Sequence, residues 1–260
     1  NNTYFSVPYF KALDDNKDFT FTPRFYSTEK LLLQNEYRVV EKNRKTFTDL
    51  SLYTNNSDRF EGHFFYKSDI DINSKNFSNT SLKLIFENST DDLYLKANNL
   101  VSPLIKQNDL LEKSVKLNAS SDDLNIETNL IVYENLNKNK NDKYEYILPK
   151  INLTKKLNNK TKLDGDFEFK TNNFIHNYET NIFERVNNNS LIFISRPRIS
   201  NSGFYSNYEF ILKNSNTNSQ KSKFHKEGED LYVSGLYQFN SSYPLIKKNK
   251  NNINLLKPKI

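Results

Sequence analysis

The stretch Asp18-Phe19-Thr20-Phe21-Thr22-Pro23-Arg24-Phe25 places aromatic or other apolar residues at odd positions and polar residues at even ones. Successive side chains of a β-strand point to opposite faces, so this alternation predicts a strand with one polar face and one apolar face. The same alternation recurs at 59–64, at 162–170 and at 231–239. Helical spacing of apolar residues is hard to find, and the chain is therefore predicted to be all-β.

Turn-like segments rich in Asn, Asp, Ser and Lys separate the predicted strands. They lie at 11–17, 55–58, 135–142, 187–189 and 214–226. Some are tight and others long, a mixture typical of a membrane barrel with short turns at one rim and longer loops at the other. The segments leave room for about a dozen strands, which is more than one soluble sandwich usually needs.

The composition suits strands that are polar on one side. Aromatic residues make up 14% of the chain, although hydrophobic residues of all kinds reach only 36%. This aromatic content is too high for a disordered tail. Tyr and Phe gather at strand ends, as in Phe25-Tyr26, in the manner of the aromatic girdle of a membrane barrel. Because no apolar run approaches about 18 residues, the sequence predicts no transmembrane helix.

Residues with catalytic or metal chemistry are sparse. His63, His176 and His225 lie far apart, and none has a second ligand at metal spacing; the sequence contains no Cys. Acidic pairs such as Asp91-Asp92 and Asp122-Asp123 are interpreted as turn formers, since neighbouring carboxylates on a strand point to opposite faces. The net charge of +6 comes from interspersed basic and acidic residues, which disfavours a nucleic-acid surface. We expect no enzyme, no cofactor and no metal.

The ends of the sequence resemble those of an internal segment. The chain contains no Met, and its first residues have neither the basic nor the apolar region of a signal peptide. We therefore expect a fragment of a longer protein, with both flanks missing.

Three motifs near the N-terminus carry a family resemblance. They are Val7-Pro8-Tyr9-Phe10, then Asp18-Phe19-Thr20-Phe21-Thr22-Pro23-Arg24, then Leu31-Leu32-Leu33-Gln34-Asn35-Glu36-Tyr37-Arg38. Weaker echoes follow in the same order at 89–95, 148–152 and 242–245. Together they resemble the barrel domain of LptD, the lipopolysaccharide-assembly family of the outer membrane. In that family a "PY" strand precedes a "D-x-T-x-T-P-R" strand and a "G-x-x-L-x-x-E-x-R" strand. The glycine that the family has in the second turn is replaced here.

The resemblance implies a fold and a function. Residues 1–260 would form the N-terminal part of an antiparallel transmembrane β-barrel, here an incomplete, curved sheet without the jellyroll and the closing strands. The whole protein would insert lipopolysaccharide into the outer leaflet of the cell outer membrane through a lumen and a lateral gate. Its partners would be an LptE-like plug lipoprotein and the periplasmic Lpt bridge. Pro8 and Pro23 would weaken the gate seam, because proline has no N–H to donate to a strand ladder.

Under this resemblance the alternation assigns side chains to the two faces of the barrel wall. The lipid-facing candidates are Phe19, Phe21 and Phe25. The lumen-facing candidates are Thr20, Thr22, Arg24, Glu36 and Arg38.

Two alternatives remain from the sequence. One is another outer-membrane barrel, such as a porin or a receptor. The other is a soluble all-β protein that binds carbohydrate or lipid, which requires a second sheet to bury the apolar faces.

Overall fold

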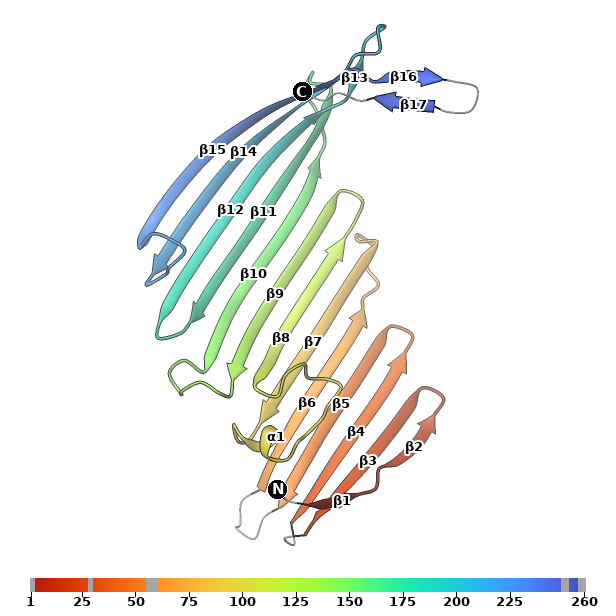
Figure 1. The fold of residues 1–260 in the computed structure, drawn as a ribbon, viewed down its shortest axis with the longest axis vertical. Coiled ribbons are helices and arrows are strands. Elements are labelled where there is room, and N and C mark those ends of the chain that lie inside the picture. Colours follow the sequence, from red (N-terminus) through yellow and green to blue (C-terminus); the bar gives the residue numbers. More distant parts are fainter. Residues whose placement is uncertain (1–2, 28–29, 55–59, 249–252, 257–260) are drawn as a thin grey trace.

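The computed structural model of the protein describes residues 3–27, 30–54, 60–248 and 253–256. Most of them belong to one antiparallel sheet of 15 strands, which forms the curved wall in Figure 1. The first eight strands are β1 (Tyr4–Ser6), β2 (Tyr9–Asp14), β3 (Lys17–Tyr26), β4 (Leu31–Glu41), β5 (Arg44–Thr54), β6 (Phe60–Asp71), β7 (Asn79–Ser89) and β8 (Leu110–Ser120).

The later strands of this sheet are longer. They are β9 (Leu124–Asn135), β10 (Tyr144–Leu157), β11 (Gly165–Tyr178), β12 (Ile182–Ser195), the short β13 (Arg198–Ile199), β14 (Tyr205–Gln220) and β15 (Gly228–Ser242). A separate two-stranded sheet contains β16 (Leu245–Lys248) and β17 (Ile253–Leu256). Among the described residues the only helix is the single turn α1 (Tyr94–Ala97). It is not long and apolar enough to cross a membrane.

The sheet is an up-and-down meander with two open edges. From β3 to β12 every strand pairs with the next strand along the chain. The short strands β1 and β2 both pair with β3 at one edge, and β15 pairs with β14 at the other. The predictions of an all-β chain and of an open antiparallel sheet are confirmed. Its strands outnumber the expected dozen because several are short.

The strand registers define two faces. Thr20 lies opposite Glu36, and Glu36 lies opposite Asp49; we call the side that carries these residues the polar face. One residue along, Phe21 lies opposite Asn35, and Asn35 lies opposite Leu50; we call this side the apolar face. The period of two in the sequence therefore produces the two-sided sheet that the alternation predicted.

The Asn-rich runs are where the sequence prediction was wrong. Residues 187–189 lie inside β12 and residues 214–220 inside β14, although both were predicted as turns. Their amides are satisfied within the sheet: Asn189 bonds to Asn214 across the strands, and Asn216 bonds to Asn214 along one strand. The turn predicted at 11–17 shrinks to two residues between β2 and β3, and β11 begins at Gly165 rather than at 162. The turn predicted at 55–58 and Arg59 lie outside the described residues.

The main hydrophobic core lies between the sheet and the long connection from β7 to β8. We call residues 90–109 the covering segment; it contains α1 and crosses the sheet in Figure 1. Leu95 and Leu100 of this segment are almost completely buried against Leu32, Tyr53 and Phe65 of the polar face. Apolar residues within an otherwise polar face therefore explain why the segment folds onto these strands.

Candidate functional site

The predicted lumen-facing residues share one face. Thr20 lies opposite Glu36, Thr22 lies opposite Gln34, and Arg38 forms an ion pair with Asp18 at 2.7 Å. Arg24 completes the set on the same strand as Thr20 and Thr22. The structure brings these residues together on β3 and β4.

The predicted lipid-facing residues lie on the opposite, apolar face. Phe19 pairs with Tyr37, and Phe21 pairs with Asn35. Phe25 has 54% of its surface exposed. All three aromatic side chains of β3 therefore belong to the same side of the sheet.

Arg24 differs from the other polar candidates because the covering segment buries it. Its Nη1 donates to the backbone oxygen of Asn98 at 2.8 Å, and its Nη2 donates to Oε1 of Gln34 at 3.4 Å. The Tyr26 hydroxyl also donates to Asn98, at 3.2 Å. A bond from a charged group to a backbone carbonyl is among the stronger ones, so Arg24 fixes the position of the segment.

A buried polar chain continues from Arg24 into the sheet. Gln34 donates to Asp49 at 3.2 Å, and Asp49 Oδ1 lies 3.2 Å from His63 Nε2. On the other side of the ring, His63 Nδ1 lies 2.6 Å from the Ser51 Oγ. The Tyr94 hydroxyl of the covering segment lies 2.7 Å from the same oxygen. Side chains from β4, β5, β6 and α1 thus form one connected network.

The grouping of Ser51, His63 and Asp49 contains the residue types of a nucleophilic triad, which the sequence did not suggest. All three side chains are buried, and the Tyr94 hydroxyl occupies the position next to Ser51 that a substrate would need. Burial raises the pKa of Tyr94 to about 12. This geometry favours a docking network for the covering segment rather than a reaction centre.

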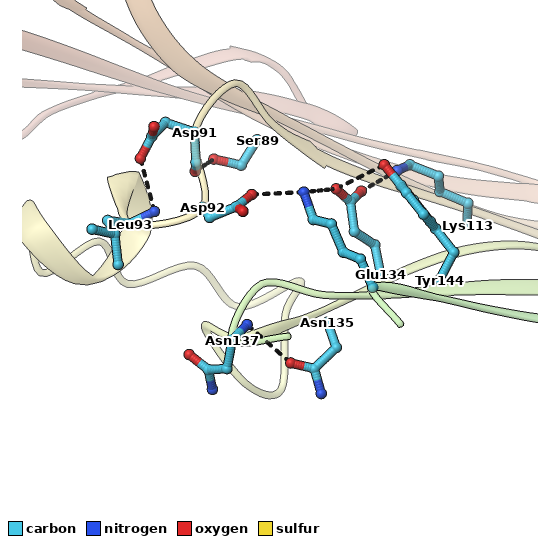
Figure 2. A network of polar contacts seen from close by, with 10 residues as sticks. Ser89, Asp91, Asp92, Leu93, Lys113, Glu134, Asn135, Asn137 and Tyr144 are labelled. Carbon is cyan, nitrogen blue, oxygen red and sulfur yellow. Dashed lines mark hydrogen bonds and ion pairs between the residues drawn. The ribbon is translucent and has the colours of Figure 1, made fainter. Parts of the chain in front are cut away.

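A second set of contacts holds the start of the covering segment (Figure 2). Lys143, in the turn between β9 and β10, lies 2.7 Å from both Asp92 and Glu134. Lys113 lies 2.6 Å from Glu134 on its other side, and the Tyr144 hydroxyl donates to Glu134 at 3.2 Å. Burial opposes the charge of Lys143, but its two carboxylate partners outweigh that effect and raise its pKa.

The two predicted gate prolines lie at the open edge of the sheet. Pro23 is within β3, whereas Pro8 lies between β1 and β2 rather than inside a strand. The register is the same on both sides of this gap, because Ser6 pairs with Arg24 and Tyr9 pairs with Phe21. Continuing that register places Pro8 opposite Thr22, next to Pro23. The interruption of the edge ladder thus coincides with the two residues that lack an N–H.

The apolar face carries an exposed band of aliphatic and aromatic side chains. It includes Leu52, Phe64, Phe86, Val115, Leu130, Phe210, Leu212 and Tyr237, all at least partly open to solvent. Among the described residues, no second sheet of the kind that a sandwich needs is paired over this face. A continuous exposed apolar surface of this extent marks a lipid or protein contact.

The band runs diagonally across the hydrogen-bonded rows of the sheet. One row on this face passes from Leu82 on β7 through Leu117 on β8 to Asn187 on β12 and Asn216 on β14. The same row is therefore apolar at one end and polar at the other. On β14 the apolar residues instead lie about four to six residues away, at Phe210 and Leu212.

The slope of the band follows from the registers. Between β5, where it is centred on Leu50 and Leu52, and β14, where it is centred on Phe210 and Leu212, the band moves about 12 residues along the strands. This shift spans eight steps from strand to strand. A residue advances about 3.3 Å along a strand, and neighbouring strands lie about 4.8 Å apart. The strands are therefore inclined by about 45° to the direction perpendicular to the band. Strands of transmembrane barrels tilt by about 35–45° from the membrane normal.

Comparison with known proteins gives no match to any family model and no match to a curated protein. Within the described residues, no group of three or more His, Cys, Asp and Glu side chains is placed to hold a metal ion.

Sequence reasoning missed the covering segment and the residues that dock it. His63 was considered only as a possible metal ligand but is buried in this network, and Asp49, Ser51 and Tyr94 were not singled out. One signal was present: the connection contains the apolar runs Leu93-Tyr94-Leu95, Leu100-Val101 and Leu104-Ile105. Such residues in a long loop indicate that the loop packs against something.

Proposed function

We propose that this chain forms part of the wall of an outer-membrane β-barrel of the lipopolysaccharide-assembly type. The apolar band faces the lipid, the polar face lines the lumen, and the covering segment folds inward against the wall. The protein inserts lipopolysaccharide into the outer leaflet with an LptE-like plug lipoprotein and the periplasmic Lpt bridge as partners.

The diagonal apolar band is the observation that carries the membrane part of the proposal. In a tilted barrel, a belt at constant height in the bilayer must cross the hydrogen-bonded rows at the tilt angle of the strands. The band crosses the hydrogen-bonded rows at about 45°. On the apolar face, both β12 and β14 change to Asn where the strands extend past the band. A soluble sandwich has no reason to displace its core along successive strands in this way.

The lipopolysaccharide part of the proposal rests on the N-terminal motifs and on the edge at which they lie. The "PY" motif lies at the start of β2, with Pro8 just before the strand, and the "D-x-T-x-T-P-R" motif lies within β3, beside the open edge. The ladder between β3 and the edge strands β1 and β2 is interrupted at Pro8 and Pro23, so the edge strands have fewer hydrogen bonds to break when they move away from β3. That property suits a seam that opens sideways to release a lipid.

Charge substitution at two positions of one strand tests the membrane proposal. Phe210 and Asn216 both lie on the apolar face of β14, but only Phe210 lies in the band, with 43% of its surface exposed. We expect Phe210→Arg to weaken insertion by about 2–4 kcal/mol, because an arginine near the bilayer midplane costs that much. Asn216→Arg should insert as the native chain does. The measurement is reversible folding into lipid vesicles.

Equal effects at the two positions would overturn the membrane proposal, since the strand, the face and the new side chain are the same. Equal and small effects would favour a soluble protein. Unequal effects in a protein whose loss leaves surface lipopolysaccharide unchanged would favour a porin or a receptor instead.

The gate is tested by restoring the missing donors. The double variant Pro8→Ala with Pro23→Ala allows additional ladder bonds at the edge and should slow lipid export. The measurement is the amount of lipopolysaccharide at the surface of cells that depend on the protein. Pro197→Ala, between β12 and β13, is the control. Unchanged surface lipopolysaccharide in the double variant would exclude the gate role of these prolines.

A further inference from the structure

A pocket of about 310 Å³ lies on the polar face where the covering segment ends. Strands β6 to β9 form its floor, and residues 104–107 of the covering segment form one side. Four lysines line it: Lys67 from β6, Lys83 from β7, Lys106 from the segment and Lys116 from β8. Two carboxylates, Glu87 and Glu112, also line it, so the lysines outnumber them. We call this site the lysine pocket.

Two of the lysines face each other directly. Lys83 on β7 and Lys116 on β8 are paired residues of neighbouring strands, and both side chains lie on the polar face. Like charges at opposed positions destabilise a sheet. Each lysine has one acidic neighbour that only partly offsets the repulsion. Lys83 lies 3.5 Å from Asp69, and Lys116 lies 2.6 Å from Glu112. An anion between the two ammonium groups would remove this repulsion.

The remaining lysines extend the positive charge around the opening. Among the ion pairs of the described residues, neither Lys67 nor Lys106 has an acidic partner within 4.0 Å. Glu87 forms no ion pair with either lysine among these contacts, and its Oε2 accepts the backbone N–H of Glu112 at 2.7 Å. The ammonium groups are therefore available to a ligand.

One wall of the lysine pocket is apolar. Ile85, Leu104, Leu110 and Tyr133 line it beside the lysines. A pocket that combines a few convergent charges with an apolar wall is the usual form of a small-ligand site. The combination fits an anionic group attached to an apolar or ring-shaped body.

We propose that the lysine pocket binds a phosphate group. Phosphate carries up to two charges and several acceptor oxygens, which match ammonium donors on three sides. Lys83 and Lys116 hold the phosphate between them, Lys67 and Lys106 close the ring, and the apolar wall contacts whatever carries the phosphate. This inference does not depend on the cargo proposed above, because it follows from the arrangement of the lysines.

Binding of inorganic phosphate to the full chain in detergent micelles tests the proposal. Low ionic strength keeps the charges unscreened. We expect Lys83→Gln with Lys116→Gln to weaken phosphate binding about tenfold or more, since two charge-assisted contacts are lost. The matched control is Lys170→Gln with Lys213→Gln, which removes two lysines of the polar face on β11 and β14, outside the pocket. The control should bind as the native chain does.

Thermal unfolding of each variant, measured with and without phosphate, separates a loss of phosphate binding from a failure to fold. Removing the opposed lysines should raise the midpoint without phosphate and abolish its further rise with phosphate. A second pair of substitutions, Lys67→Gln with Lys106→Gln, should weaken binding without raising the midpoint. Equal loss of binding in the pocket and control variants would overturn the proposal, as would the absence of phosphate binding to the native chain.

Micelles that contain phosphatidic acid distinguish two sources of the phosphate. If a lipid headgroup is the natural ligand, the native chain should bind phosphatidic acid at least tenfold more tightly than inorganic phosphate, because the apolar wall adds contacts to the acyl chains. Similar affinities indicate a free or soluble phosphate. Phosphate binding and membrane insertion are measured in separate experiments. The proposal of a phosphate site can therefore be wrong while the membrane proposal is correct.

Discussion

The two halves of this sheet have the same topology but differ in what covers their polar faces. From β3 to β8 the covering segment packs on that face, and the large buried residues gather there, among them Leu32, Tyr53 and Phe65. From β10 to β15 none of the described residues forms a comparable layer, and most side chains are half-buried or exposed. Figure 1 shows the segment over the first half alone.

The difference teaches what stabilises each half. The covered half has a small hydrophobic core and a buried polar network, so it gains from burial as a soluble domain does. The uncovered half is held by long ladders and by polar bonds between neighbouring strands: Asn172 donates to Asn152, and Ser215 donates to Asn188. Under the proposed function, such a wall would have solvent on one side and lipid on the other.

The largest expected effect comes from emptying the core beneath the covering segment. Leu95 is fully buried, and Leu95→Ala should lower the free energy of unfolding by about 2–5 kcal/mol. Ile192→Ala, on the polar face of the uncovered β12, should cost less because that side chain is only half-buried. Urea unfolding in micelles measures both. Equal losses would mean that the two halves are stabilised in the same way.

Next in size is the effect of charge on the band in the covered half. Phe21→Lys should block membrane assembly, at a cost of about 2–4 kcal/mol, whereas Thr20→Lys on the polar face should be tolerated. Folding into lipid vesicles measures both variants. Agreement with the Phe210 result would show that the band is continuous from one half to the other. Equal tolerance at the neighbouring positions would contradict the assignment of the faces.

The smallest expected effect is a loss of stability in alkali, confined to the covered half. Burial raises the pKa of Tyr94 from 10.0 to about 12, so the unfolded chain loses the phenol proton first. The stabilisation is complete below about pH 10 and is lost as the pH rises through about 12. At pH 11 the free energy of unfolding should have fallen by about 1.4 kcal/mol. Tyr94→Phe should flatten this decline, and parallel declines in both proteins would refute the role of Tyr94.

Much of the fold was predictable from local pattern. The alternation around Phe19 and Phe21 predicted β3, its two faces and the shared side of Thr20, Glu36 and Arg38. These features depend only on the period of two in an extended chain. The Asn runs were not predictable in this way, because Asn favours turns locally yet is stable in a strand when neighbouring strands offer amide partners.

The candidate sites depended on contacts that the sequence does not display. Arg24 and Asn98 are 74 residues apart, and Ser51 and Tyr94 are 43 residues apart. The opposed pair of Lys83 and Lys116 exists only because of the register between β7 and β8. Neither residue would stand out in a chain with 37 basic residues.

The sequence by itself determined that the chain is all-β and that its strands are polar on one side. Each of these properties follows from the preferences of a few neighbouring residues. Only the tertiary structure decided the slope of the apolar band, the docking of the covering segment and the lysine pocket. Those properties arise from the stagger between strands and from the folding of a loop onto a face, and both are set by contacts between residues far apart in the chain.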